Sequence, residues 1–583
     1  GHQPMTSRDN TIIFNGEIYN YKELRDELKK KGHNFVTTSD TEVILKMYEE
    51  FGVDCVNQLN GMFAFIIFDK NKNKLFAARD HFGIKPLYFY NDETYLIFGS
   101  EIKAILQHPE VQATPNLQAV NQYLTFQFVL GTDTLFKNIY KLSPGHFMSV
   151  NLDTMDFSVK KYWEPNFNVD EHHTEEYFVY QLKNLLDDTI NIQLRSDVPV
   201  GSYLSGGMDS SIVTSLAAKK LEGSFKSFTG AFREGDEFDE TKYAREVANT
   251  SESELFEIYP TEDEFIKYLP KLIYHLDEPV AGPGLFPQYM VSKLASEKVK
   301  VILGGQGGDE IFGGYARYVV AYLEQAIKGA IYESNEEEEH IVSLNSILPN
   351  LSHLNNYMPM LREFMKTNAF GEMDERYFKL IDRRNGSNDL YTDDFLTSYN
   401  KEEIFEQFKK LFNHPDTKSF YNKMTHFDMT NSLPALLQVE DRVSMAVSIE
   451  CRVPLLDRRI ADLVASMPPA MKFKGAEMKY ILKRAAKDII PKSIFERKDK
   501  MGFPVPLHIW ANNKASGFFE DVLLSSTCKS RGIFNTENIK GLIHNERAFG
   551  RKLWGVLCLE LWFQQFIDND IKLSRKEVYE VQS

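Results

Sequence analysis

Cysteine is scarce in this sequence and shows no pairing pattern. The 583 residues contain four cysteines, Cys55, Cys451, Cys528 and Cys558, and no two of them are spaced as CxxC or CxxxC. Neither a disulfide framework nor a zinc cluster is expected from such spacing, and the pattern is typical of a reducing compartment. We therefore expect a cytoplasmic protein.

Positive charge and long apolar runs are also scarce. The 67 lysines and arginines are outnumbered by 83 aspartates and glutamates, which gives a net charge of −16. No broad basic face is then available to hold a phosphate backbone, so a nucleic-acid partner is not expected. The longest apolar runs, such as residues 62–68, have the length of a strand and not of a membrane span. Neither a membrane segment nor a secretory signal is expected.

The remaining composition is that of an ordinary globular protein, with 43% hydrophobic and 26% charged residues. At about 150 residues per domain, the length predicts two to four domains. Up to about residue 163 the pattern indicates short strands and two helices, at 21–31 and 40–51. A polar stretch at 164–173 marks the predicted domain boundary.

Strands and helices are predicted to alternate beyond this boundary, which indicates a parallel sheet with helices on both faces. From about residue 318 to 427 the chain is expected to be helical and rich in aromatic residues, with the acidic run 336–339 on a solvated surface. The predicted strands of the sheet are 198–204, 225–228 and 299–303.

The strongest motif is a glycine-containing turn between a predicted strand and a predicted helix. It reads SGGMDSS over residues 205–211. Glycines let backbone N–H groups approach an anion, and the start of the helix adds its dipole. Asp209 supplies a carboxylate that can hold Mg²⁺ against phosphate oxygens. Because the sequence has no Gly-Lys dipeptide, this predicted phosphate site lacks the Walker A lysine.

A second glycine-rich loop follows another predicted strand and reads GGQGGDE over residues 304–310. Two such loops at the ends of strands in one sheet line the same crevice, where α/β sheets bind ligands. Together they predict a nucleotide site with a divalent metal. Lys479, on a helical pattern further along the chain, is a candidate for the fixed positive charge that stabilises a phosphorylated or adenylated transition state.

These motifs, taken together, resemble those of the glutamine-dependent asparagine synthetases, and SGGMDSS resembles the loop of ATP-pyrophosphate lyases. The match covers nearly the whole chain in the family's order. Besides SGGMDSS, it rests on NGEIYN at 15–20, SDTE at 39–42, ARD at 78–80 through KPLYF at 85–89, SEIKA at 100–104, residues 304–315, and SMA at 444–446 through RVPLLD at 452–457.

The resemblance implies an α/β protein with two domains. Residues 1–163 would form an N-terminal-nucleophile (αββα) glutaminase domain, incomplete at its start. Residues 174–583 would form a parallel-sheet ATP-pyrophosphatase domain of the adenine nucleotide hydrolase-like type. The implied reaction uses ATP to adenylate aspartate, releases pyrophosphate, and lets ammonia made from glutamine displace AMP. The implied ligands are aspartate, glutamine or ammonia, ATP and Mg²⁺, and a homodimer stays open.

The resemblance also assigns roles residue by residue. Asp209 and Asp309 would bind Mg²⁺, and Lys479 would stabilise the acyl-adenylate chemistry, with Gln306 in the catalytic loop. In the glutaminase domain, Asn15 and Gly16 would form the oxyanion hole, and Asn15, Glu17 and Asp40 would bind glutamine. The residues that would bind ATP are Leu204, Ser205, Gly206, Gly207, Ser210, Gly230, Gly304 and Gly305.

Two features depart from the family. Its nucleophile is a cysteine at the mature N-terminus, whereas residue 1 here is Gly1. That cysteine and the glutamine-binding arginine are expected upstream of Gly1, and Cys55 is no substitute because it has no free α-amine. The chain as given is then expected to make no ammonia from glutamine. The second departure is Gln306, where many relatives have an acid; it either shapes the loop or marks a different acceptor carboxylate.

Two alternatives to asparagine formation follow. One is a paralogue that amidates another carboxylate, such as a uronic acid of a polysaccharide. The other is a non-catalytic relative with a degenerate site, which the intact loop at 205–211, Asp309 and Lys479 argue against.

Overall fold

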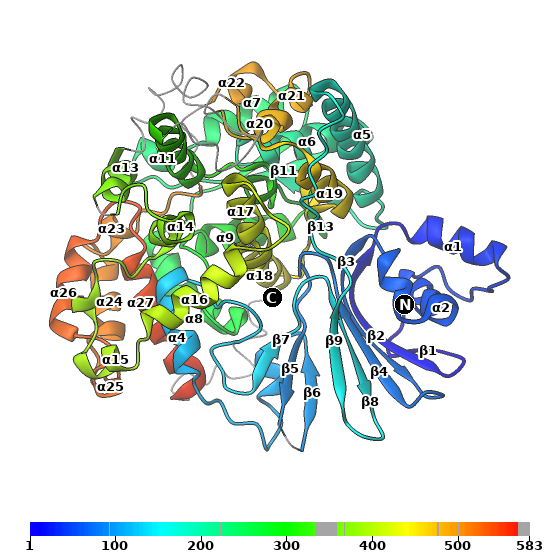
Figure 1. Ribbon diagram of the computed structural model, residues 1–583, viewed down its shortest axis with the longest axis horizontal. Helices are drawn as coiled ribbons and strands as arrows, with labels where there is room; N and C mark the ends of the chain where they lie inside the picture. The colour runs from blue at the N-terminus through cyan, green and yellow to red at the C-terminus, as the bar shows by residue number, and fades with distance from the viewer. Residues whose placement is uncertain are drawn as a thin grey trace. The chain divides into compact units, whose positions relative to one another are not determined.

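A computed structural model of the chain describes residues 1–92, 94–221, 223–332, 358–366, 368–474, 477–497 and 502–568 (Figure 1). It divides into two compact units. The first unit comprises Gly1–Ala113, Gly131–Pro165 and Ile192–Arg195, and the second comprises Thr114–Leu130, Asn166–Asn191 and Ser196–Ser583. The acidic run 336–339 falls outside the described residues.

The first unit contains two antiparallel sheets. Helices α1 (Tyr21–Lys30) and α2 (Asp40–Phe51) confirm the two helices predicted here, and α2 starts at an N-cap, Ser39, whose side chain accepts a hydrogen bond from the Thr41 N–H. The six-stranded sheet has the order β1 (Met5–Ser7), β2 (Asn10–Ile18), β3 (Gly61–Asp69), β4 (Lys74–Arg79), β8 (His146–Asn151), β9 (Phe157–Lys161), and the three-stranded sheet has the order β6 (Leu96–Gly99), β5 (Tyr88–Asn91), β7 (Ile139–Lys141).

The side chains of β3 alternate between two cores. Phe63, Phe65 and Ile67 pack with the apolar residues of α1 and α2, whereas Ala64 and Ile66 pack with those of the three-stranded sheet. The short helix α3 (Ile102–Ile105) contacts β5 and β6 of that second sheet. The layers therefore run helix, sheet, sheet, helix, which confirms the predicted αββα class.

The second unit is built on a five-stranded parallel sheet, as the sequence predicts. Its order is β12 (Glu254–Ile258), β11 (Lys226–Gly230), β10 (Val200–Tyr203), β13 (Val301–Leu303), β14 (Glu450–Arg452). In sequence order this is 3-2-1-4-5, so the direction of winding reverses between β10 and β13, which pair from Val200↔Val301 to Ser202↔Leu303. Such a switch point is where open α/β sheets bind ligands.

Helices α6 (Met208–Lys220) and α7 (Thr241–Ser251) pack together over β10 to β12, and α9 (Leu285–Ser296) packs with α18 (Leu433–Met445) over the same sheet. The other helices that involve the second unit are α4 (Leu117–Phe126), α5 (Glu175–Gln193), α8 (Glu262–Leu276), α10 (Gly308–Phe312), α11 (Ala316–Tyr332), α13 (Met358–Met365), α14 (Met373–Ile381), α15 (Asp393–Thr397), α16 (Lys401–Phe412), α17 (Phe420–Phe427), α19 (Arg458–Ser466), α20 (Pro469–Lys472), α21 (Tyr480–Ala486), α22 (Lys492–Phe495), α23 (Leu507–Trp510), α24 (Ala515–Leu523), α25 (Ser526–Arg531), α26 (Thr536–Asn545) and α27 (Lys552–Trp562).

The predicted helical region contains a buried cluster of polar side chains inside an aromatic core. The Asp428 carboxylate lies 2.5 Å from the Arg317 guanidinium and accepts hydrogen bonds from the hydroxyls of Tyr318 and Tyr377. The Arg317 guanidinium also lies 3.8 Å from the centre of the Tyr315 ring. Tyr315 lies three residues beyond the end of α10, so this polar cluster supports the segment that follows the second glycine-rich loop.

All four cysteines are buried thiols without disulfides, in agreement with the sequence analysis. Within the described parts of the chain, we find no helix with the length and apolar character needed to cross a bilayer.

We predict that Asp428→Asn destabilises the protein by roughly 3–5 kcal/mol, because it leaves the Arg317 charge without its buried counterion. Urea unfolding would measure the change. The matched control is Asp488→Asn, in an exposed pair with Lys183 at 3.8 Å, which should cost no more than about 1 kcal/mol. Equal effects of the two substitutions would contradict this account of the polar cluster.

Candidate active site

The two glycine-rich loops meet at the switch point of the parallel sheet. The loop at 205–211 follows β10, and the loop at 304–310 follows its neighbour β13. They are in contact, because a Cβ built on Gly305 would lie 2.7 Å from the backbone nitrogen of Ser210. This confirms that both loops line one crevice.

The first loop is held by its own serines. The hydroxyls of Ser205 and Ser210 lie 3.0 Å apart, and the Ser211 hydroxyl donates to the Gly207 carbonyl at 2.6 Å. Gly207 is the N-cap of the 13-residue helix α6, and it offers no side chain to hydrogen-bond the first-turn N–H groups. The positive end of the helix dipole and the loop N–H groups therefore form an arrangement suited to phosphate.

Lys479 joins the two loops through a pair of short ionic contacts. Its ammonium lies 2.6 Å from Asp209 Oδ2 and 2.5 Å from Asp309 Oδ1. Lys479 is 7% exposed and Asp209 is 5% exposed. Burial alone would lower the pKa of Lys479, but the two carboxylates outweigh it and raise that pKa above its ordinary value. The lysine therefore carries a permanent charge at the crevice.

The backbone at Lys479 departs from the helix that the sequence predicts there. Helix α21 begins only at Tyr480, and Lys479 is its N-cap, with φ of +55°. A left-handed conformation is unfavourable for a residue with a side chain, by about 1 kcal/mol or more. The contacts with Asp209 and Asp309 supply the compensation.

Two glycines make room for this cluster. A Cβ on Gly308 would lie 2.5 Å from Cγ of Asp209, and a Cβ on Gly314 would lie 2.0 Å from Oδ1 of Asp309 and 2.1 Å from Cε of Lys479. The close approach of the three charged side chains therefore requires glycine at both positions.

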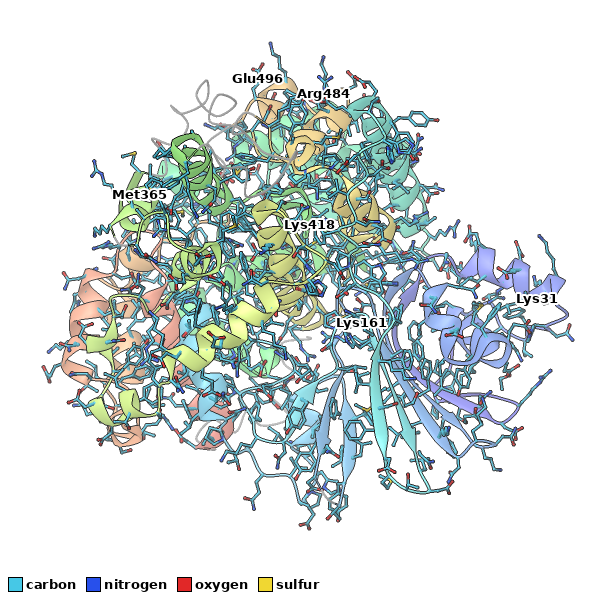
Figure 2. The ribbon with its side chains drawn as sticks, in the orientation of Figure 1. Lys31, Lys161, Met365, Lys418, Arg484 and Glu496 are labelled. Carbon is cyan, nitrogen blue, oxygen red and sulfur yellow. The ribbon has the colours of Figure 1, made fainter. Side chains whose placement is uncertain are left out.

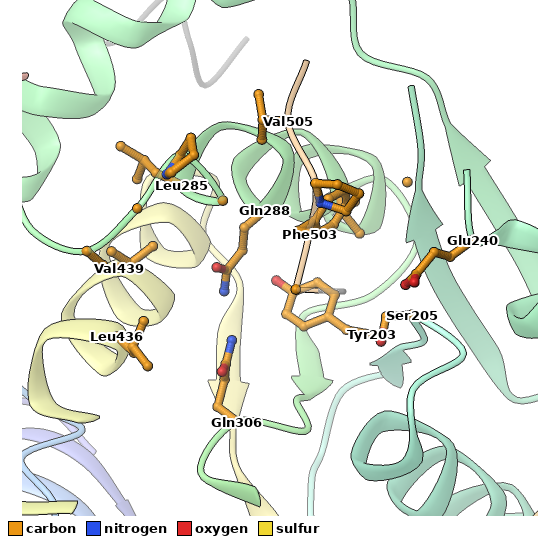
Figure 3. Close-up of a pocket in the computed structure, with 18 of the residues that line it drawn as sticks. Tyr203, Ser205, Glu240, Leu285, Gln288, Gln306, Leu436, Val439, Phe503 and Val505 are labelled. Carbon is orange, nitrogen blue, oxygen red and sulfur yellow. The ribbon is translucent and has the colours of Figure 1, made fainter. Parts of the chain in front are cut away.

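A cavity of about 520 Å³ opens at these loops, entirely within the second unit (Figure 3). Eight residues predicted for the synthetase site line it: Leu204, Ser205, Asp209, Ser210, Gly230, Gly304, Gly305 and Asp309. Gln306, also predicted, lines it too. Gly206 and Gly207 belong to the loop that borders the cavity, and Lys479 reaches it through its two aspartates.

The cavity wall contains a buried carboxylate that the sequence analysis missed. Glu440 on α18 accepts hydrogen bonds from the side-chain amides of Gln306, at 2.9 Å, and Gln288, and from the Cys451 thiol at 2.9 Å. Figure 3 shows the amide ends of Gln288 and Gln306 pointing toward each other across the cavity. The sequence did contain a sign of this buried acid. Glu440 follows Leu433 and Leu437 at helical spacing, so it lies on the apolar face of its helix.

Other lining residues also escaped prediction. Phe503 lies against the end of β11, since a Cβ on Gly230 would lie 3.3 Å from its ring. Arg551 also lines the cavity, beside Gly282. Neither residue belongs to a glycine-rich or acidic motif, and no local pattern marks them.

In the first unit, the predicted glutaminase residues lie on two neighbouring elements. Asn15, Gly16 and Glu17 lie on β2, and Asp40 is the first residue of α2. The Ile18 N–H donates to Asp40 Oδ2 at 3.0 Å, which ties the start of α2 to the end of this strand. The structure therefore places Asp40 at the end of the strand that carries Asn15, Gly16 and Glu17.

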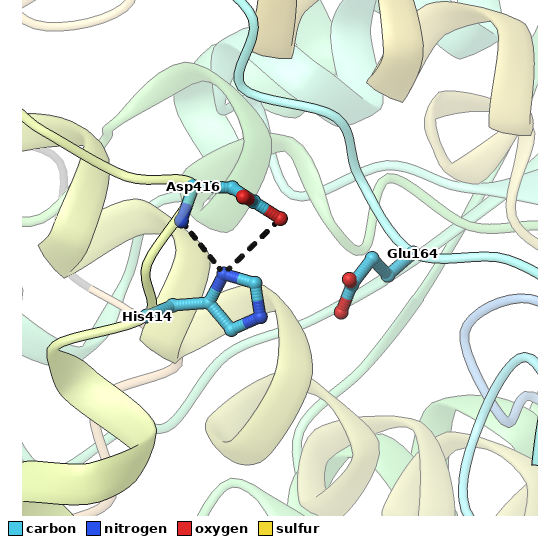
Figure 4. A group of neighbouring side chains, drawn as sticks. All are labelled: Glu164, His414 and Asp416. Atoms are coloured by element: carbon cyan, nitrogen blue, oxygen red, sulfur yellow. Dashed lines mark hydrogen bonds and ion pairs between the residues drawn. The ribbon is translucent and has the colours of Figure 1, made fainter.

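A histidine and an aspartate lie side by side in the loop between α16 and α17 (Figure 4). His414 Nδ1 lies 3.8 Å from Asp416 Oδ2 and accepts from the Asp416 N–H at 3.4 Å. A structural zinc site needs about four ligands. We assign no metal to this pair.

Two family profiles match the sequence: a glutamine amidotransferase domain over residues 1–163 and asparagine synthase over residues 181–564. The chain is 34% identical to asparagine synthetase [glutamine-hydrolyzing] 1 of Bacillus subtilis, with 99% of this chain and 90% of that protein covered. It is 31% identical to asparagine synthetase [glutamine-hydrolyzing] 3 of B. subtilis, over 87% and 78%. It is 29% identical to a putative asparagine synthetase of Mycobacterium tuberculosis H37Rv, over 96% and 85%.

We predict that Gly308→Ala weakens the binding of ATP at least about tenfold, or 1.4 kcal/mol. The added methyl group displaces the Asp209 carboxylate from Lys479. Isothermal titration calorimetry would measure the affinity. Gly517→Ala on α24 is the control, because a Cβ there meets nothing within 4 Å and should leave the affinity unchanged. An unchanged affinity in Gly308→Ala would contradict the assigned geometry.

Proposed function

Because the chain belongs to the family of glutamine-hydrolysing asparagine synthetases, we propose that its cavity is the site where ATP and aspartate react to form asparagine. The enzyme is a carbon–nitrogen ligase with glutamine as amido donor, and the family uses ATP. The observation that carries the assignment to this site is the contact of Lys479 with Asp209 and Asp309 between two glycine-rich loops.

The geometry suggests a separate role for each part of the site. The loop at 205–211 and the start of α6 bind the phosphates of ATP through backbone N–H groups. Lys479 stabilises the negative charge that passes to pyrophosphate when the aspartate carboxylate attacks the α-phosphorus. The buried position of Lys479 strengthens this effect, since its charge is weakly screened by water.

The residues also fit a magnesium ion. Asp209 and Asp309 offer carboxylate oxygens, the ligands that Mg²⁺ prefers, on one side of the two loops. We propose that these two residues hold the Mg²⁺ that accompanies ATP, where it would neutralise the pyrophosphate leaving group. Lys479 would then share both carboxylates with the ion.

The domains, the glutamine site and the cellular location are proposed from the same family membership. We propose that residues 1–163 form the amidotransferase domain, with Asn15, Gly16, Glu17 and Asp40 in its glutamine site, and that residues 174–583 form the synthetase domain. The substrates are small molecules. A cytoplasmic location is proposed because the substrates are cytoplasmic metabolites and the four cysteines are thiols. A homodimer stays a prediction.

The alternatives gain no support from the site. A degenerate binding protein would not need a buried lysine held in a strained conformation between two aspartates. The relatives reported above bear the name asparagine synthetase, and that favours aspartate over a uronic acid as acceptor.

We predict that Asp209→Asn and Asp309→Asn each lower aspartate-dependent ATP–pyrophosphate exchange at least about a hundredfold, the scale on which one key electrostatic group acts. Labelled pyrophosphate would follow the exchange. The matched control, Asp521→Asn, alters an exposed residue of α24 and should not change the rate. Exchange at the unaltered rate in Asp209→Asn would contradict the role of this loop.

With ammonium as nitrogen donor, we predict that the protein releases asparagine, AMP and pyrophosphate in equal amounts from aspartate and ATP. Chromatographic separation of the products would establish the stoichiometry. Release of ADP and phosphate, or product formation that does not depend on aspartate, would refute the proposed function.

A further inference from the structure

Besides Asp209 and Asp309, two acidic residues line the cavity, Glu240 and Glu440, and the adenylation chemistry leaves both without a role. Glu240 forms an ion pair with Arg497. Glu440 is 3% exposed and lies on α18, away from the Lys479 cluster in the sequence. Its Oε1 would lie 3.6 Å from a Cβ on Gly304, so the carboxylate stands next to the second glycine-rich loop. It lines the same cavity as Ser205, Asp209 and Asp309.

The neighbours of Glu440 donate hydrogen bonds that favour its ionised form. The amides of Gln288 and Gln306 both donate to Oε2, and the Cys451 thiol donates to Oε1. Hydrogen bonds of this kind favour the charged form of a carboxylate. No lysine or arginine is among these hydrogen-bond donors, so the negative charge of the carboxylate stays available to a cation or to a proton.

This arrangement also explains Gln306. An acid at position 306 would face Glu440 across 2.9 Å, and two like charges at that separation cannot both stay ionised. Glutamine instead donates a hydrogen bond. The carboxylate beside the loop is therefore that of Glu440 on α18. Gln306 donates a hydrogen bond to it and leaves its negative charge in place.

We propose that Glu440 is the group that accepts the proton from ammonia when ammonia attacks the activated aspartate. The inference rests on the proposed function. In this step the nitrogen lone pair forms a C–N bond to the acyl carbon. The C–O bond to the phosphate of AMP then breaks, and AMP leaves with the electron pair. One proton passes from the nitrogen to a carboxylate oxygen of Glu440, which leaves a neutral amide.

The surroundings of Glu440 fit this role. Burial raises its pKa, while the hydrogen bonds from Cys451, Gln306 and Gln288 act against that shift without cancelling it. A raised pKa makes a carboxylate a stronger base. The titratable groups that face it are Cys451 from β14, Tyr203 from β10 and Asp441 from its own helix. Its base form is present above its own pKa, so amide formation should fall as the pH drops through that value.

The first experiment compares two partial reactions in Glu440→Gln. We expect aspartate-dependent ATP–pyrophosphate exchange to stay within about threefold of wild type, because the hydrogen bonds of Glu440 come from Gln288, Gln306 and Cys451 and not from Lys479. Ammonia-dependent asparagine formation should fall at least about a hundredfold, the lower end of the range for a general base. Glu297→Gln makes the same chemical change at an exposed residue that caps α9 and should alter neither reaction.

The second experiment moves the carboxylate instead of removing it. The double variant Gln306→Glu/Glu440→Gln exchanges the acid and the amide across their hydrogen bond. We expect it to form asparagine at least about tenfold faster than Glu440→Gln alone, with an acidic limb in its pH–rate profile that the single variant lacks. A purely structural role of Glu440 would give no such recovery.

The outcomes separate the two proposals. Absence of aspartate-dependent exchange in wild type would refute the proposed function itself. With wild-type exchange intact, unchanged asparagine formation in Glu440→Gln would overturn the role of Glu440 alone. A parallel loss of exchange and amide formation, or a raised KM for aspartate, would also overturn it and make Glu440 a substrate-binding or structural residue. A double variant no faster than Glu440→Gln would overturn it as well.

Discussion

One ionic contact organises the synthetase site: the buried ammonium of Lys479 between Asp209 and Asp309. Burial alone would lower the pKa of this lysine, and two neighbouring aspartates without a cation would repel each other. Each group therefore depends on the others. The glycines at 308 and 314, the left-handed backbone at Lys479 and the contact of the two loops are the structural requirements of this cluster.

The parallel sheet brings these groups together because its winding reverses between β10 and β13. The loops that follow these adjacent strands meet at that edge, where open α/β sheets bind ligands, and the cavity opens there. Buried acids continue from this edge into the protein. Burial and the neighbouring Asp309 raise the pKa of Glu310 to about 7. The Glu310 carboxylate accepts a hydrogen bond from Tyr315, and the Tyr315 ring packs against Arg317 of the buried polar cluster. The second glycine-rich loop is therefore held by Lys479 at Asp309 and by Tyr315 at Glu310.

Local patterns in the sequence predicted most of this framework. Glycine runs after β10 and β13 identified both loops, and strand–helix alternation predicted the parallel sheet. The rest depends on contacts between distant segments. Strand β14 has three residues, too few for a periodic pattern, and Glu440 meets Gln306 across 134 positions. Residues Thr114–Leu130 group with the second unit although they precede the predicted boundary, because packing and not local composition decides their place. The αL conformation of Lys479 likewise follows from its two counterions.

The central claim is that this site joins the aspartate carboxylate to the α-phosphorus of ATP before nitrogen arrives. Aspartate labelled with ¹⁸O in its side-chain carboxylate tests it most directly. If that oxygen attacks the α-phosphorus, displacement by ammonia leaves it on the phosphate of AMP. Mass spectrometry should then find one labelled oxygen in each AMP formed and none in pyrophosphate. Label in pyrophosphate or inorganic phosphate, with unlabelled AMP, would contradict the account.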